Sequence, residues 1–218
     1  TFDLTHNNAM YAAVFIVRFD PLGNESWFRI FGGGTYNQVG QMILVGEDRL
    51  MLTGDVEGTV IYLDEEPDLF SAVAPRSSFL LEVDTAGTFL RQVTWGSENT
   101  LNTRSLSVHD DDVVVYGRFQ CQFTGFSTIY GEGTWLASGQ YDLYAARFGM
   151  ENFEYKEAQQ FGGQKNKVPG RVVHTLDGEV VFCGAFDRLL VFPNGADEFH
   201  TTPPEHGVSV PSVPPGVC

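Results

Sequence analysis

The feature that most constrains the fold is a motif that recurs three times along the chain. Each copy runs from one aromatic residue, through a polar break, to a second aromatic residue that precedes glycine. Apolar and polar residues alternate on both sides of the break, which is typical of two antiparallel strands joined by a tight turn. The copies span 15–31, 79–95 and 144–161, so the motif repeats every 64 to 66 residues.

A second hairpin and a further apolar strand are predicted after each copy, which gives four strands per repeat. In the third hairpin the break contains Asp177-Gly178, a pair that suits a type I′ turn. The hairpins lie at 41–54, 104–117 and 171–184, and the following strands at 59–63, 121–127 and 188–192. Aligning the hairpins places Ile43, Leu106 and Val173 at one equivalent position, and Leu52, Val115 and Phe182 at another.

Four short strands cannot bury their apolar sides alone, so neighbouring repeats must stack to form a core. We therefore predict an all-β fold of tandem four-stranded antiparallel repeats, with about three units arranged like β-propeller blades, alone or within a larger array. The predicted boundaries are the end of a preceding repeat at 1–10, repeats at 11–70, 71–135 and 136–199, and a proline-rich linker or tail at 200–218.

Composition and charge limit the fold of the chain and the kinds of partner that it can bind. With 24 glycines and 13 % aromatic residues, the chain suits short strands and tight turns. Its net charge of −15 repels nucleic acid and anionic membrane surfaces. The sequence contains no apolar run long enough to span a bilayer, so we expect no membrane insertion.

The segment FIVRFDPLGNESWFRIFGG at 15–33 resembles the bacterial β-propeller repeat known as SBBP. Units of that family read roughly Asp-x-Phe-hydrophobic-Ala-Lys-Phe-Asp, then Gly-Asn, Trp and Phe-Gly-Gly, then a hairpin ending in Thr-Gly. GEGTWLASGQYDLYAARF at 131–148 is similar to the passage between two units, and the resemblance covers 11–192. The chain departs from the pattern at Gly96-Ser97, and at Gly149, which replaces the Asp. The resemblance implies a propeller fold in a secreted or surface protein, and no family-wide catalytic residues.

The three cysteines, Cys121, Cys183 and Cys218, form no CxxC pair, so the sequence contains no zinc ribbon or dithiol redox motif. One disulfide plus a spare thiol and three reduced thiols are both compatible with the sequence. We interpret Cys121 and Cys183 as buried structural residues, because free cysteine often behaves as a small core hydrophobe.

Two acidic clusters are candidate cation sites. Asp110, Asp111 and Asp112 align with the breaks of the other second hairpins, where Asp favours turn formation, so we interpret them as a solvated turn without bound metal. The second cluster follows a predicted strand, and a cation site there stays the minor alternative to a plain loop. It consists of Asp64, Glu65, Glu66 and Asp68.

No other motif identifies catalytic, cofactor or metal residues. The histidines His6, His109, His174, His200 and His206 show no ligand spacing, and His200, Glu205 and His206 fall in the proline-rich tail. The chain has no GxSxG motif, and its glycine clusters at 32–34 and 131–133 lack the lysine of a phosphate loop. Asn24-Glu25-Ser26 matches a glycosylation acceptor, but we interpret it as the turn of the first hairpin.

These observations favour a structural, adhesive or protein-interaction module that is extracellular or at the cell surface. The alternatives are a carbohydrate-active enzyme, which needs two facing carboxylates in a cavity, and a binding propeller that uses Trp135 or Tyr130, although Trp135 suits a core position better.

The number of repeats also predicts that the chain does not stand alone. Three stacked repeats leave two apolar end faces exposed, a state that soluble monomers avoid. The end faces must then be covered by more repeats of a longer array, suggested by 1–4, or by further copies that form a homo-oligomeric ring or filament.

Overall fold

The computed structural model describes residues 13–32, 36–62, 70–97, 99–123, 126, 134–192 and 198–200, and it is all-β with antiparallel sheets. Among these residues, no helix is long and apolar enough to cross a membrane. The predicted segment at 1–10 lies outside the described residues, and so does the predicted tail at 200–218 except for His200, which ends the strand β16 (Glu198–His200).

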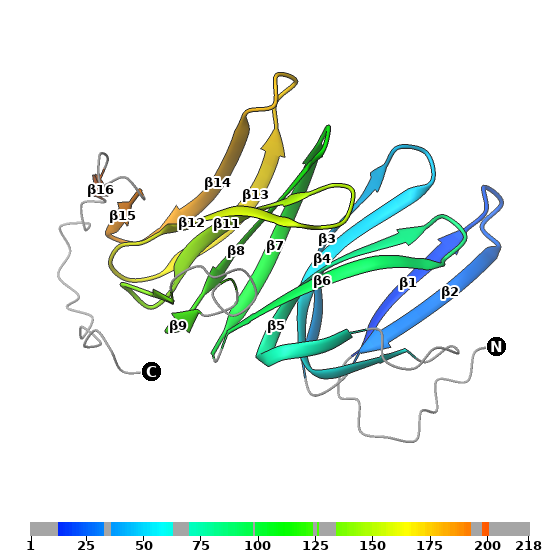
Figure 1. Cartoon of the computed structure of the whole chain (residues 1–218), viewed down its shortest axis with the longest axis horizontal. Helices are drawn as coiled ribbons and strands as arrows, with labels where there is room; N and C mark the ends of the chain where they lie inside the picture. The colour runs from blue at the N-terminus through cyan, green and yellow to red at the C-terminus, as the bar shows by residue number, and fades with distance from the viewer. Residues whose placement is uncertain are drawn as a thin grey trace.

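Two four-stranded antiparallel meanders, which we call the complete sheets, form the centre of the molecule (Figure 1). The first lies within a larger 8-stranded sheet, and the second is a separate sheet. The first contains β3 (Asn37–Val45), β4 (Arg49–Tyr62), β5 (Phe70–Asp84) and β6 (Phe89–Ser97). The second contains β7 (Leu101–His109), β8 (Asp112–Phe119), β11 (Asp142–Gly149) and β12 (Tyr155–Phe161).

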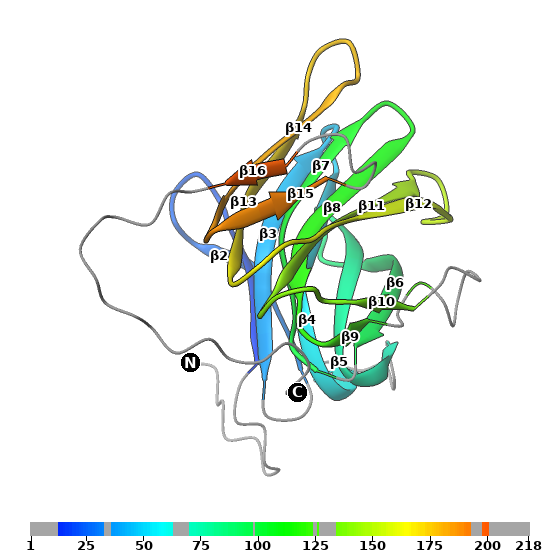
Figure 2. The same ribbon diagram turned by 90° about the vertical axis from the view of Figure 1, so that its left-hand side faces the viewer.

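A two-stranded hairpin lies at each end of this stack. In Figure 1, β1 (Val14–Phe19) and β2 (Glu25–Gly32) flank the first sheet, and β13 (Lys167–His174) and β14 (Val180–Phe186) flank the second. Viewed from the β13–β14 end, the hairpins β13–β14, β7–β8 and β3–β4 lie one behind another (Figure 2).

The sheets are out of phase with the sequence repeat. Each predicted repeat contributes its first hairpin to one sheet and its second hairpin to the next, because β4 pairs with β5 and β8 pairs with β11. The four-stranded units therefore begin at Asn37 and Leu101, and not at the repeat starts near Phe15, Phe79 and Tyr144.

The turns of the first hairpins explain part of the repeat. Asp20 Oδ1 accepts hydrogen bonds from the backbone N–H groups of Leu22 and Asn24, and Asp84 Oδ1 accepts the same pair from Ala86 and Thr88. Hydrogen bonds lower the pKa of both carboxyls, chiefly the bond from the Asn24 side-chain amide in the case of Asp20 and the bond from the Thr88 N–H in the case of Asp84. In the third copy, Gly149 carries no carboxylate, and the Phe153 N–H donates to its carbonyl oxygen instead.

The prediction of a type I′ turn at Asp177-Gly178 is wrong. A type I′ turn needs positive φ at both central residues, but only Gly178 has one, with a φ of 86°. The Gly178 N–H donates to the carbonyl oxygen of Thr175, and the Thr175 N–H donates to that of Glu179. The turn therefore has the same backbone bonds as the turn that Asp20 opens.

The alignment of the second hairpins needs one correction. Leu52, Val115 and Phe182 are equivalent, because each points toward the preceding sheet and has its partner at one equivalent position across the hairpin. That position holds Met42, Leu106 and Val172, so Ile43 and Val173 are each one residue out of register with Leu106. A slip of one residue exchanges the two faces of a strand, which is why Val173 is exposed while Leu106 is buried.

The core lies between successive sheets. One cluster joins β1–β2 to the first sheet through Ile16, Phe31 and Phe79. The largest joins the two complete sheets and includes Trp95, Phe126, Tyr144 and Phe148, and a third joins the second sheet to β13–β14. The central strands β5 and β8 therefore bury both faces, which accounts for their apolar residues at successive positions. On β3, at the edge of the first sheet, Met42 and Leu44 are exposed.

The predicted strands at the ends of the repeats are short and form bridges between sheets. The segment 59–62 continues β4, while the other two copies give β9 (Gln122–Phe123) and β15 (Leu189–Val191). Each pairs with the end of the outermost strand before it, as Gly32 with Ile61, Ser97 with Phe123, and Gly162 with Val191. Two short strands extend the bridges, namely β10 (Trp135–Leu136) on β9 and β16 (Glu198–His200) on β15.

Candidate functional site

The acidic turn at 110–112 lies on the surface, as predicted. Asp110 and Asp111 are exposed at the tip of the β7–β8 hairpin, and Asp110 has a φ of 47°. Asp112 is half-buried and forms ion pairs with Lys156 at 2.6 Å and Arg147 at 3.7 Å. The run is therefore partly neutralised by its own cations.

Several predicted candidates fall outside the described residues. These are Asp64, Glu65, Glu66, Asp68, Tyr130, Glu205 and His206. Among the residues that are described, no group of three or more His, Cys, Asp and Glu side chains could hold a metal ion.

Two histidines that the sequence does not link come together. The rings of His109 and His174 stack with centroids 5.6 Å apart. His174 Nδ1 also lies 3.0 Å from Ser107 Oγ, and burial lowers the pKa of His174. This pair joins the tip of β7 to β13 and belongs to the contact between neighbouring sheets.

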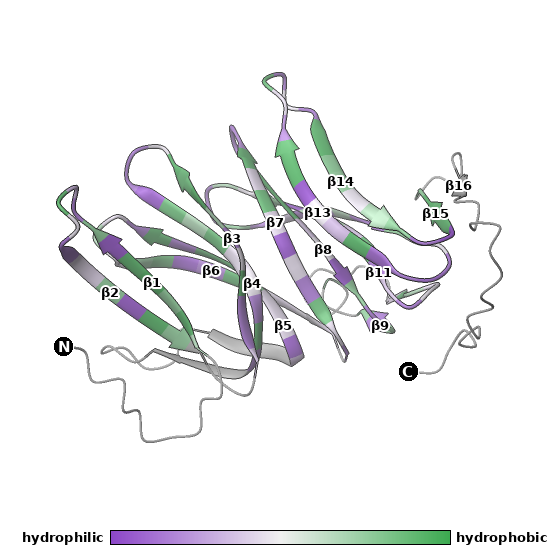
Figure 3. Ribbon diagram, turned by 180° about the vertical axis from the view of Figure 1, so that it is seen from behind, coloured by the Kyte–Doolittle hydropathy of each residue, from purple (hydrophilic) through white to green (hydrophobic). Residues whose placement is uncertain are grey.

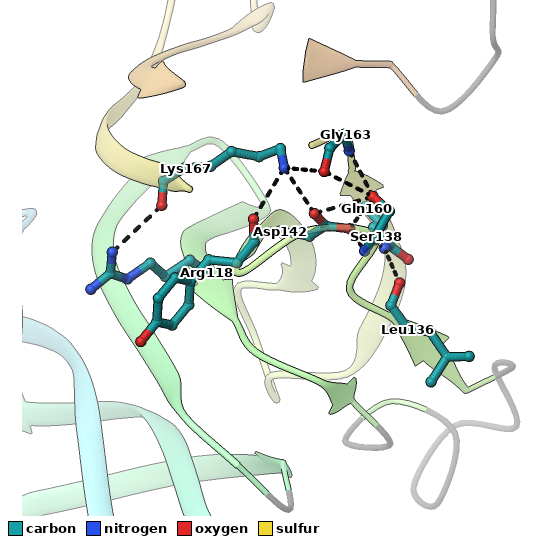
Figure 4. A network of polar contacts seen from close by, with 8 residues as sticks. Arg118, Leu136, Ser138, Asp142, Gln160, Gly163 and Lys167 are labelled. Atoms are coloured by element: carbon teal, nitrogen blue, oxygen red, sulfur yellow. Dashed lines mark hydrogen bonds and ion pairs between the residues drawn. The ribbon is translucent and has the colours of Figure 1, made fainter. Parts of the chain in front are cut away.

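A buried polar network surrounds Asp142, at the start of β11 (Figure 4). Lys167 Nζ donates to Asp142 Oδ1 at 3.0 Å and to the Gly163 carbonyl oxygen at 2.7 Å. Asp142 Oδ2 accepts from the Ser138 N–H at 2.9 Å and from the Gln160 amide at 2.7 Å. Lys167 and Asp142 are both fully excluded from solvent.

The contacts around Lys167 and Asp142 are those of a structural ion pair. Burial lowers the pKa of Lys167, while the neighbouring Asp142 opposes that shift. Ser138 Oγ donates to the Asp142 carboxylate at 3.1 Å and accepts from the Gly163 N–H at 2.7 Å. The hydroxyl is therefore held between a carboxylate and a backbone amide, and its hydrogen bonds join three separate segments.

An open cavity of about 630 Å³ lies beside the network. Its described lining residues include no carboxylate, so it does not provide the acid pair that glycoside hydrolysis requires. The lining consists of Trp135, Ser138, Ala158, Gln159, Gln160, Gly162, Gly163, Gln164, Leu189, Val191 and Phe192. Trp135 itself is half-buried and packs against Phe119 and Phe123, in agreement with a core position.

A second buried network joins the two complete sheets around Asp55 of β4. The carboxylate accepts hydrogen bonds from Ser78 Oγ, from the Thr103 N–H at 2.8 Å and from the Asn102 amide at 2.7 Å. Burial raises the pKa of Asp55 to about 7, against the lowering effect of these bonds. The side chain is therefore a titratable group at an interface between sheets.

The cysteines follow the prediction only in part. Cys183 is a free thiol but is exposed, because its side chain lies on the outer side of β14. Cys121 is half-buried and takes part in a disulfide. The interpretation of Cys183 as a core residue is wrong.

The outer side of the β1–β2 hairpin is apolar. Side chains alternate between faces along a strand, and Val14 and Ile16 point into the core, so the intervening residues point outward. We call this the N-terminal face. It consists of Phe15, Val17, Phe19, Phe28 and Ile30, with Phe15 opposite Ile30, Val17 opposite Phe28, and the rings of Phe15 and Phe28 stacked at 6.3 Å.

The outer side of the β13–β14 hairpin is also mainly apolar. We call it the C-terminal face. Figure 3 shows apolar segments on both end hairpins. Val168 lies opposite Ala185 and Val173 opposite Val181, while Val172 and Phe182 point into the core. The face consists of Val168, Val173, Val181, Cys183 and Ala185.

Equivalent positions in the complete sheets are buried. Phe15 is 63 % exposed, whereas Phe79 and Tyr144, the residues one and two periods further on, are fully buried. The same holds at the other end, where Val181 is 50 % exposed and its equivalents Met51 and Val114 are buried. The end faces therefore carry the side chains of a sheet-to-sheet contact that has no second sheet among the described residues.

The exposed end faces could be predicted from the sequence, whereas the networks around Asp142 and Asp55 could not.

A comparison with protein-family models gives no match, and neither does a comparison with curated proteins.

Proposed function

We propose that this chain is a structural or protein-interaction module of a secreted or cell-surface repeat protein, and that it associates through the N-terminal and C-terminal faces. The observation that carries the proposal is the exposure of Phe15, Phe19 and Val181 at positions that are buried in the complete sheets. Exposed apolar patches of this kind mark interaction surfaces in soluble proteins.

A propeller-like arrangement of the sheets supports the proposal. In a propeller the first strands of neighbouring blades converge on the axis. Here a Cβ at Gly40 of β3 would lie 2.2 Å from the Thr103 carbonyl oxygen of β7. Ser105 Oγ of β7 accepts from the Val172 N–H of β13 at 3.0 Å. The first strands β3, β7 and β13 therefore lie against one another, which supports a propeller-like arrangement.

Two further observations favour an extracellular setting. Cys121 takes part in a disulfide, and disulfides persist mainly in oxidising compartments. The resemblance of 15–33 to the SBBP repeat points to the same class of secreted and surface proteins.

Light scattering on chromatographed protein tests the association. We expect the wild-type chain to have a mass above 24.1 kDa, and the double variant Phe15→Glu, Phe19→Glu to have the monomer mass. Both side chains are exposed, so the variant should keep the circular dichroism spectrum of a folded all-β protein. Leu90→Glu is the matched control, because Leu90 is 48 % exposed on β6, outside the end faces.

A folded wild-type monomer at all concentrations would contradict the proposal. Equal dissociation by Leu90→Glu would also contradict it, because association would then not depend on the end faces.

A further inference from the structure

The two end hairpins correspond to different halves of one four-stranded sheet. The hairpin β13–β14 is equivalent to β3–β4 and β7–β8, which are the first two strands of the complete sheets. The hairpin β1–β2 is equivalent to β5–β6 and β11–β12, which are the last two. In the described part of the chain, β14 pairs only with β13 and β1 only with β2.

We propose that β14 of one copy pairs with β1 of a second copy, so that the two hairpins complete a sheet in the order β13, β14, β1, β2. This inference rests on the proposed function and specifies its partner as a second copy of this chain. It also fixes the register of the contact, because the same pairing occurs twice within the chain.

Both internal examples place an aromatic residue opposite a glycine. Gly54 of β4 lies opposite Phe79 of β5, and Gly117 of β8 lies opposite Tyr144 of β11. A Cβ at Gly54 would lie 2.9 Å from the Phe79 ring, and a Cβ at Gly117 would lie 2.8 Å from the Tyr144 ring. In each sheet the ring lies directly over the glycine.

The end hairpins retain both halves of this contact. Gly184 of β14 occupies the glycine position, and Phe15 of β1 occupies the aromatic position. Continuing the register pairs Phe182 with Val17 of the second copy, Val181 with Arg18, and Val180 with Phe19. The third sheet would therefore repeat the glycine and aromatic contact of the other two.

The proposed pairing would bury exposed side chains of both end hairpins. In the complete sheets, Phe79 and Tyr144 point toward the preceding sheet, so Phe15 of the second copy would point toward Tyr116 and Leu143 of the first. Met51 and Val114 point toward the following sheet, so Val181 would point toward the first complete sheet of the second copy. One interface therefore covers the N-terminal face of one copy and the C-terminal face of the other.

The edge of β14 lacks the features that keep exposed strands apart. Natural edge strands carry charged residues or proline that block pairing. The sequence of β14 is VVFCGAF, which contains neither. The edge is therefore open to strand addition.

The number of sheets per chain favours a ring of two chains. Each chain supplies two complete sheets and two halves, which amounts to three sheets. Propellers typically close with about 4 to 8 blades, so one copy is too few and three copies, with nine, too many. Two copies give six, and a head-to-tail contact closes into a ring when its rotation allows.

Cysteine cross-linking between two different chains tests the register. Both chains carry Cys183→Ser, one carries Val181→Cys and the other Arg18→Cys. Both substituted positions are exposed, and opposite residues in an antiparallel pair have Cβ atoms about 4.5–5.5 Å apart. We expect mild oxidation of the mixture to shift the protein to a covalent dimer on a non-reducing gel, while each chain alone stays monomeric on that gel.

Phe19→Cys in place of Arg18→Cys is the matched control, because position 19 points to the opposite face of β1. Its mixture with Val181→Cys should stay at the background level of dimer. Association by light scattering without the specific cross-link would overturn the composite sheet but leave the proposed function standing. A mixture that neither associates nor cross-links would overturn both.

Discussion

The Nζ atom of Lys167 lies 3.0 Å from Oδ1 of Asp142, and neither side chain is exposed to solvent. Replacing Lys167 by Met removes the cation and leaves the carboxylate buried. Since removing one partner of a buried ion pair typically costs about 3–5 kcal/mol, we expect Lys167→Met to lower the free energy of unfolding by roughly that amount. Urea denaturation measures the loss.

Lys156→Met serves as the control for this prediction. Lys156 forms its ion pair with Asp112 at the surface, where such pairs contribute little, so its loss should leave the urea midpoint nearly unchanged. Equal effects of the two substitutions would mean that the buried Lys167 pair stabilises the protein no more than the surface pair.

The carboxyl of Asp55 predicts a pH dependence of stability. Burial raises its pKa from 3.8 to about 7, so between these values the folded state holds a proton that the unfolded state has lost. The free energy of unfolding should therefore fall as pH rises from about 4 to 7, by a few kcal/mol, and level off above that range.

Asp55→Asn tests the assignment, because an amide does not titrate. Unfolding measured at a series of pH values should show a flatter dependence between pH 4 and 7 in the variant than in the wild type. An unchanged slope would assign the dependence to other groups.

Gly117 predicts a steric effect. A Cβ at this position would lie 2.5 Å from the Asn102 carbonyl oxygen and 2.8 Å from the Tyr144 ring. Overpacking of this kind typically costs about 1–3 kcal/mol, so Gly117→Ala should lower the melting temperature. Gly149→Ala is the control, because the atoms nearest its Cβ belong to the flexible side chain of Glu154, and it should change the melting temperature less.

Asp111 predicts the absence of a calcium effect. The residue is exposed at a hairpin tip, so Asp111→Asn should leave the melting temperature unchanged, both with calcium and with a chelator. A calcium-dependent rise in the wild type that disappears in this variant would show that the turn binds the ion.

The sequence predicts strands well where apolar and polar residues alternate on both sides of a polar break. The hairpins at 15–31 and 79–95 follow from this pattern, and β1–β2 and β5–β6 have the expected antiparallel form. The grouping of hairpins into sheets does not follow, because the pairing of β4 with β5 depends on contacts between repeats. The one-residue error at Ile43 and Val173 has the same origin, since alternation fixes the period of a strand but not its register against a partner.

The end faces could be predicted because exposure at Phe15 follows from counting repeats. The networks around Asp142 and Asp55 could not, because their members come from distant segments. Lys167 lies 25 residues from Asp142, and Thr103 lies 48 residues from Asp55. No local spacing connects such residues, so only the packed sheets show that they meet.

The phase difference between repeat and sheet has a consequence for how the array can change in length. Phe79 and Tyr144 occupy equivalent positions in successive sheets, so excising 80–144 would join Phe79 to Ala145, the residue that follows Tyr144. The hybrid strand would pair with β4 on one side and β12 on the other, and the resulting sheet would still contain four strands. Insertion of one period at any point would add a complete sheet in the same way. Duplication and deletion can therefore lengthen or shorten this protein at any breakpoint, provided that a whole period is gained or lost.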